Sequence, residues 1–268
     1  MSAVEELCAL WGLELDPGQR AFGDWNLVLL AHRGSEPCVL RVSGPEVNAV
    51  EEVTALRAWN GRGAVRVLEA RSDAMLLERL DPHRSLRTVK LPDALEIAGD
   101  LIRTLSVPAP PGLPLLVDIA REYAEGLDAW QLAQGSPVPP AWLDRARTLA
   151  IELTSDPGTD LVHGDLHFDN ILAGTRSPWL AIDPKPFVGH PERSVAELMW
   201  TRLDEVTDVH GTLAAVVRAG GLDADRALAW TIVQTTHYWL WALGAGLTED
   251  PVRCHRLLEA LLGTGGDR

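Results

Sequence analysis

The spacing of hydrophobic and polar residues changes near residue 80. Before that point the apolar residues fall in short β-type runs separated by turn-forming segments. The runs expected to be strands cover 26–31, 38–43, 65–70 and 74–80. One helical segment, 47–59, stands among them and is followed by NGRG, whose glycines end helices readily. The first part of the chain is therefore predicted to be a small sheet with one helix.

After residue 80 the apolar residues recur with a helical period of about 3.6. Helices are expected over 93–106, 114–134, 140–155, 191–207 and 223–246. Two segments interrupt this pattern, LVHGDLHFDNIL and WLAIDPKP, and are predicted to be short strands carrying loops. We therefore divide the chain into a sheet-containing part, 1–80, a hinge near 78–82, and a mainly helical part, 83–268.

Polar residues are concentrated in these two interrupting segments. Asp165 and Asn170 lie five residues apart in one loop, and Asp183 follows 13 residues later, after the apolar run 179–182. The three oxygen-bearing side chains are expected to meet on one side of a hairpin. An amide and two carboxylates suit Mg²⁺, which binds few protein ligands and leaves positions for phosphate and water.

Composition narrows the classes of protein that remain. The 268 residues are 46% hydrophobic, enough for one large core or two coupled ones. A net charge of -14 and a pI of about 4.9 disfavour binding to nucleic acid. Cys8, Cys38 and Cys254 form no CxxC pair, and we expect reduced thiols. No signal peptide or long uncharged apolar run is present, so we expect a cytoplasmic protein without a membrane partner.

The motifs HGDLHFDN and IDPK resemble the catalytic and metal-binding loops of aminoglycoside phosphotransferases. The segments LRAWNGRGAVRVLEA, MLLERLDPHRSL, VPAPPGL and PWLAIDPKPFVGHP resemble, in order, segments of the streptomycin 6-kinase and hydroxyurea phosphotransferase branch of that family. The similarity covers about residues 20–246. It implies an α+β, bilobal, protein-kinase-like fold with a small β-sheet lobe, which carries one helix, and a larger helical lobe.

The resemblance also implies roles for individual residues. Asp165 would accept or orient the proton of the attacking hydroxyl, and Asn170 and Asp183 would hold Mg²⁺ against the phosphates of ATP or GTP. His163 would brace the loop. Backbone groups from Glu78 to Leu80 would meet the purine base.

The chain departs from the family pattern at the expected phosphate-binding residues. VLRVS places Arg41 where the family's VLKVS has lysine, and a surface strand arginine is the alternative reading. Glu52, or else Glu51, is the expected helix partner of Arg41. No glycine-rich loop precedes this strand, because AFGDWN offers only Gly23.

The region expected to bind the acceptor departs from the pattern too. Gly189, His190, Pro191 and Ser194 stand where relatives often carry carboxylates, and 227–247 contains no acid. One stripe of the last predicted helix carries four residues, Trp230, Gln234, His237 and Trp241, which either pack in the core or form a ligand wall for a flat, less cationic compound.

These observations predict ATP- or GTP-dependent O-phosphorylation of a small antibiotic, which would confer resistance. The acceptor would be an aminoglycoside such as streptomycin, or a less cationic compound such as a nucleoside antibiotic or hydroxyurea. Arg41 and the poor glycine loop leave a nucleotide-binding pseudokinase or regulator as an alternative. A zinc hydrolase using His163 and His167 is a further one, although Gly164 and the β-type flanks argue against the helix that HxxxH spacing needs. His167 and Asp169 would otherwise support the loop.

Overall fold

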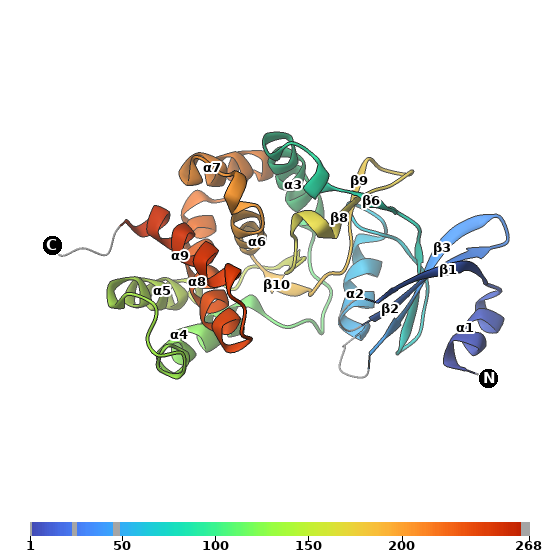
Figure 1. Cartoon of the computed structure of the whole chain (residues 1–268), viewed down its shortest axis with the longest axis horizontal. Helices are drawn as coiled ribbons and strands as arrows, with labels where there is room; N and C mark the ends of the chain where they lie inside the picture. Colours follow the sequence, from blue (N-terminus) through green and yellow to red (C-terminus); the bar gives the residue numbers. More distant parts are fainter. Residues whose placement is uncertain (1, 23–25, 45–48, 264–268) are drawn as a thin grey trace.

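The computed structural model describes residues 2–22, 26–44 and 49–263. An antiparallel sheet and a helical part lie side by side, with α1 and α9 at opposite ends of the molecule (Figure 1). The α-helices are α1 (Ala3–Trp11), α2 (Ala49–Trp59), α3 (Leu91–Leu105), α4 (Leu116–Ala133), α5 (Pro140–Leu153), α6 (Val195–Trp200), α7 (Val209–Gly220), α8 (Ala224–Gly244) and α9 (Glu249–Leu262). The strands are β1 (Glu14–Phe22), β2 (Asn26–Arg33), β3 (Glu36–Ser43), β4 (Val67–Ala70), β5 (Ala74–Glu78), β6 (Asp81–Ser85), β7 (Asp160–Val162), β8 (Ile171–Ala173), β9 (Trp179–Ala181) and β10 (Phe187–Gly189).

The N-terminal sheet has the strand order β1-β2-β3-β5-β4, and its neighbouring strands are antiparallel. Side chains of a strand alternate between its two faces. In β3, Cys38 and Leu40 are buried in a cluster with Leu7 of α1, whereas Val39 and Arg41 line a cavity on the opposite face. The sheet therefore has one face covered by α1 and another that is available to a ligand.

The helical part packs around α8, which contacts α4, α5, α6 and α9, while α3 packs on α7. Its largest apolar cluster continues into the N-terminal part through α2, where Val53, Leu56 and Trp59 are buried. The indole Nε1 of Trp59 donates to the carbonyl of Leu105 at 2.8 Å, which ties the end of α2 to the end of α3. The two parts thus share a core.

The β8–β9 hairpin joins the two parts near the expected hinge. The N–H of Val65 donates to the carbonyl of Ala181 at 2.8 Å, so β9 pairs with the segment before β4. In the loop of the hairpin, Arg176 donates to the carbonyl of Gly61 at 2.5 Å and to the carboxylate of Glu78 at 2.6 Å. Glu78 ends β5 and is the first residue of the 78–82 segment predicted as a hinge, and that division of the chain stays a prediction.

Several elements differ from the sequence prediction. The single helix expected over 191–207 is wrong, because the segment forms a 3-10 turn (Pro191–Ser194), the short α6 and a second turn (Leu203–Glu205). The helix stops where Arg202 takes φ −130 and ψ 30, and the Arg202 guanidinium donates to the carbonyl of Val89 at 2.9 Å. The predicted start of α2 at 47 lies outside the described residues.

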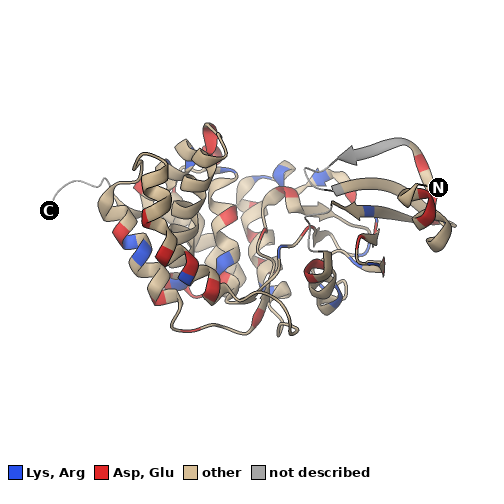
Figure 2. Ribbon diagram, turned by 90° about the horizontal axis from the view of Figure 1, so that it is seen from below, with Lys and Arg blue, Asp and Glu red and all other residues tan. Residues whose placement is uncertain are grey.

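Charged residues of both signs occur in both parts of the chain that the structure describes. Lys and Arg residues are scattered among Asp and Glu over both the sheet and the helices (Figure 2). Within the described ranges, every helix is too short or too polar to cross a bilayer.

Candidate active site

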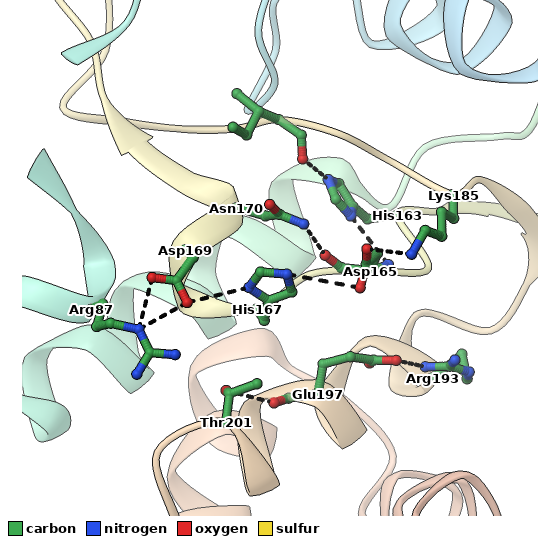
Figure 3. Close-up of polar contacts among 11 residues, drawn as sticks. Arg87, His163, Asp165, His167, Asp169, Asn170, Lys185, Arg193, Glu197 and Thr201 are labelled. Carbon is green, nitrogen blue, oxygen red and sulfur yellow. Dashed lines mark hydrogen bonds and ion pairs between the residues drawn. The ribbon is translucent and has the colours of Figure 1, made fainter. Parts of the chain in front are cut away.

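The site is built on the loop that follows β7, and His163 anchors it. The ring is 1% exposed and lies 6.0 Å from the Trp59 ring in a stacked arrangement. Nδ1 accepts from the backbone N–H of Asp165 at 3.4 Å, so Nε2 carries the proton and donates to the carbonyl of Ile182 at 3.0 Å. Burial lowers the pKa of His163 to about 4, which keeps the ring neutral. His163 therefore holds the loop to the end of β9 (Figure 3).

Gly164 allows the loop to approach the next segment closely. Its φ is +73, and a Cβ atom there would lie 1.9 Å from the carbonyl oxygen of Lys185. The N–H of Lys185 in turn donates to the carbonyl of His163 at 2.9 Å. Only a residue without a side chain fits this position.

Asp165 comes next, with a side chain that is 21% exposed. Lys185 Nζ lies 2.8 Å from its Oδ2, and His167 Nε2 lies 4.0 Å from its Oδ1 (Figure 3). His167 is also 3.8 Å from Asp169, which accepts from Nε of Arg87 at 2.7 Å. A chain of polar contacts thus runs from Asp165 to the exposed Arg87.

Asn170 and Asp183 lie at the two ends of the β8–β9 hairpin. The Nδ2 group of Asn170 donates to the backbone carbonyl of Asp165 at 2.9 Å, and the N–H of Ile182 donates to the carbonyl of Asn170 at 2.9 Å. Asp183 has a φ of +57, which a residue with a side chain adopts at some cost and which is enriched at functional sites. The hairpin brings both side chains to one cavity.

Arg41 reaches the same cavity from β3. One nitrogen pairs with Glu52 of α2 and the other lies 2.9 Å from Oδ1 of Asp183. Arg41 is 7% exposed and Glu52 4% exposed. Burial raises the pKa of Glu52 to about 7, against the opposing effect of Arg41. The alternative that Arg41 is an exposed strand residue is wrong, and the structure places Glu52, as expected, beside it.

The cavity between the sheet and the helical part has a volume of about 270 Å³. Its lining includes Arg41, Glu78, Leu80, Asn170 and Asp183, together with apolar residues of β2 and β3. The N–H of Glu78 already donates to Arg66 at 3.0 Å, and the Glu78 carboxylate accepts from Arg66 and Arg176. The nucleotide-site residues expected from the sequence thus lie together, whereas Gly23 lies outside the described residues.

The stripe on α8 is divided between core and surface. Trp230 is 2% exposed and Gln234 is 8% exposed, whereas Trp241 is 54% exposed. His237 stacks on Tyr123 of α4 at 4.0 Å, and burial lowers its pKa to about 4. His237 and Trp241 line a separate cavity of about 350 Å³ with Trp130 and other residues. The core reading therefore holds for Trp230 and Gln234, and a ligand wall at the other end of the helix stays a prediction.

Two features of the site were not assigned from the sequence. Lys185 stood in the IDPK motif without a role, yet it contacts Asp165. Arg193 and Glu197 form a buried ion pair of 2.5 Å beneath the catalytic loop (Figure 3). Their spacing of four residues was the available signal, since such pairs meet on a helical turn.

The zinc alternative does not fit this geometry. Both ring nitrogens of His163 are bonded to backbone groups, so His163 and His167 cannot bind one ion together. Among the described residues, His, Cys, Asp and Glu form no cluster of three suited to a metal ion.

The arrangement around Asp165 is that of a protein-kinase-like phosphotransferase, and solved structures share its fold. An aminoglycoside phosphotransferase, APH(4)-Ia, solved with ADP and hygromycin B, superposes with a TM-score of 0.67 at 16% identity, covering 98% of this chain and 100% of the other. A more specific assignment comes from sequence. The chain belongs to the family described as aminoglycoside/hydroxyurea antibiotic resistance kinase, whose profile matches residues 16–246.

Two relatives carry the branch names that the motifs suggested. Streptomycin 6-kinase of Streptomyces glaucescens is 37% identical over 97% of this chain and 88% of its own length. Hydroxyurea phosphotransferase of Kitasatospora aureofaciens is 40% identical over 98% of this chain and 79% of its own length. The predictions of the fold class, of the family and of a small-molecule kinase are confirmed.

Proposed function

We propose that this protein transfers the terminal phosphoryl group of ATP or GTP to a hydroxyl of a small antibiotic and so inactivates it. The observation that carries the proposal is that Asn170 and Asp183 line the cavity between sheet and helices, while the Asn170 side chain is bonded to the backbone of Asp165. Family membership supports the same reaction. We expect it to run in the cytoplasm, where nucleotide and Mg²⁺ are abundant.

The donor set fits Mg²⁺. Because Asn170 uses Nδ2 for the Asp165 carbonyl, its Oδ1 is the atom left for a ligand, and the Asp183 carboxylate lines the same cavity with 45% of its side chain exposed. One amide oxygen and one carboxylate are a ligand set that Mg²⁺ completes with phosphate oxygens and water. When bound, the ion would neutralise charge on the phosphates.

The chain's own residues orient the reaction. Asp165 accepts the proton of the acceptor hydroxyl, and its position matters more than its basicity because the transition state of phosphoryl transfer is loose. Arg41, held between Glu52 and Asp183, supplies positive charge to the cavity. The backbone near Glu78 and Leu80, which line the same cavity, would meet the base.

The acceptor would be bound by aromatic and acidic groups of α8 and α9. Tyr238 stacks between Trp200, at 4.9 Å, and the exposed Trp241, at 5.5 Å. The Tyr238 hydroxyl donates to Asp250 of α9 at 3.0 Å. The Asp250 carboxylate that α9 brings to this helix also pairs with Arg253 at 3.0 Å, so a cationic acceptor would have to share or displace that pair. Gln234 and His237 would shape the wall behind this platform.

Mass spectrometry of reaction mixtures tests the proposal. Purified protein, Mg²⁺ and either ATP or GTP would be incubated with streptomycin, hygromycin B, a nucleoside antibiotic or hydroxyurea. We expect one compound to gain a single phosphate, and to gain it far more slowly with Asp165→Asn. Nucleotide binding without transfer to any compound would contradict the proposal and favour the pseudokinase alternative that Arg41 and the poor glycine loop suggested.

A further inference from the structure

We propose that Lys185 is a catalytic residue that holds Asp165 before the reaction and contacts the phosphoryl group during its transfer. This inference rests on the proposed kinase activity and adds a residue to it. It starts from one contact, because Lys185 Nζ lies 2.8 Å from Asp165 Oδ2 (Figure 3).

The backbone of Lys185 is fixed although its side chain is free to move. Its N–H donates to the carbonyl of His163, and its carbonyl packs against Gly164, so the residue cannot shift relative to the catalytic loop. The side chain is 70% exposed, which leaves the ammonium room to change partners. A surface ion pair that only aided stability would not need such anchoring, since exposed pairs contribute about 0–1 kcal/mol.

Lys185 also stands between the two reacting ends of the site. Asp183, two residues earlier, lines the nucleotide cavity, and Pro184 between them restricts the backbone. Asp165, on the other side, would receive the acceptor hydroxyl. The phosphoryl group must pass between these two carboxylates, within reach of the ammonium.

The residue type supports this role. The chain has only two lysines, Lys90 and Lys185, among its 24 basic residues, and even the β3 position carries arginine. A guanidinium beside Asp165 would bind both carboxylate oxygens with its planar fork. An ammonium is a compact charge on a flexible stem and can rotate from one oxygen to another.

The chemistry of phosphoryl transfer explains why Lys185 would exchange Asp165 for the phosphoryl group as its ion-pair partner. The acceptor oxygen forms a bond to the γ-phosphorus, the bond from that phosphorus to the β,γ-bridging oxygen breaks, and the nucleoside diphosphate leaves with the electron pair. The hydroxyl proton passes to Asp165, whose carboxylate becomes neutral. Lys185 stays protonated, loses its anionic partner at that moment and pairs with the phosphoryl oxygens instead.

A nucleotide acyl phosphate, an ATP analogue whose terminal phosphate carries an activated acyl group, tests the placement without turnover. The reagent acylates amines next to the phosphates, and Arg41 has no reactive amine. We expect acylation of Lys185 that excess ATP prevents, whereas the exposed Lys90 serves as the internal control. Equal labelling of both lysines, or no protection by ATP, would overturn the placement.

Three variants test the contribution to rate. Lys185→Gln is expected to lower kcat by about 10²–10³, the usual cost of removing one donor to a developing charge, with little change in the KM for nucleotide. Lys185→Arg should recover part of the rate, and Lys90→Gln should match the unmodified protein. A normal kcat in Lys185→Gln would refute the role.

The two proposals fail in different ways. If Lys185 is labelled and protected but no compound is phosphorylated, the kinase function is wrong and the position of Lys185 beside the phosphates stands. If a compound is phosphorylated and Lys185 is neither labelled nor needed, the role of Lys185 is wrong and the kinase function stands.

Discussion

The side-chain amide of Asn170 donates to the backbone carbonyl of Asp165 at 2.9 Å, not to its carboxylate. The bond joins the two ends of the catalytic loop through the main chain. The carboxylate of Asp165 takes no part in this bond, and its own contacts are with Lys185 and His167. A change of the Asp165 side chain should leave this loop contact intact.

Asp165→Asn should consequently slow turnover severely without unfolding the loop. We expect kcat to fall by about 10²–10⁴, the range for loss of a general base, and the nucleotide Kd to stay near its normal value. Steady-state kinetics with the identified acceptor and calorimetric titration with nucleotide measure the two quantities. A variant that keeps most of its rate would contradict the assignment of Asp165.

Variants of Arg41 test how much its buried ion pair contributes to the free energy of unfolding. Arg41→Ala leaves the buried Glu52 without its partner, and losing one member of a buried ion pair typically costs about 3–5 kcal/mol. Adding Glu52→Gln to that variant should restore part of the loss, because the buried charge is removed. Urea denaturation measures the free energy of unfolding.

Arg33 provides the matched control for this experiment. Its pairs with Glu36 and Glu69 are exposed, so Arg33→Ala should cost no more than about 1 kcal/mol. Equal losses in Arg33→Ala and Arg41→Ala would show that burial of the Arg41 pair has no energetic consequence.

Alanine variants of Gly164 and Gly135 distinguish the energetic cost of backbone strain from that of steric overlap. Both glycines have positive φ, +73 and +76, but only Gly164 has an atom within 4 Å of the position a Cβ would occupy. Gly135→Ala should cost about 1–2 kcal/mol, the penalty of the left-handed conformation. Gly164→Ala should cost considerably more and displace Lys185. Thermal denaturation of both variants, in parallel, gives the comparison.

The free energy of unfolding should depend on pH because His237 binds a proton less readily in the folded protein than in the unfolded chain. Its folded pKa, about 4, lies below the usual 6.5, so the unfolded chain binds a proton first as the pH falls. Stability is therefore lost between pH 6.5 and 4, by up to about 3 kcal/mol for this shift. His237→Phe preserves the stack on Tyr123 and removes this loss. If the free energy of unfolding fell equally with pH in both proteins over that range, the inference would be contradicted. His163, whose pKa is also lowered, contributes the same loss in both proteins.

Local signals in the sequence were sufficient for the catalytic loops. Asp165 and Asn170 are joined by a hydrogen bond within 163–185, so their spacing described this part of the candidate site, whereas the Asp183 side chain pairs with Arg41 of β3. The partner of Arg41 was predictable for a similar reason, because one strand and one following helix bring Arg41 and Glu52 together.

Long-range contacts explain what the sequence did not predict. The break in 191–207 comes from Arg202, whose guanidinium bonds to carbonyls more than 100 residues earlier in the chain. The helices α1, α7 and α9 were missed, and α9 matters most, since it brings Asp250 to Tyr238. For α1 a local signal existed, because Ser2 and Glu5 form a capping box.

The hydrogen bonds of Arg176 attach the β8–β9 hairpin to the N-terminal part, so the hairpin lies where the two parts would rotate about one another. The hairpin is attached to the N-terminal part at Gly61, Ala64 and Glu78, and its base carries Asn170 and Asp183. Points close to a pivot travel least when two bodies rotate about it. An opening rotation between sheet and helices should therefore leave these two groups almost stationary and move Arg41, on β3, through a longer arc. Such a rotation would break the 2.9 Å pair of Arg41 with Asp183 and leave Asn170 and Asp183 together.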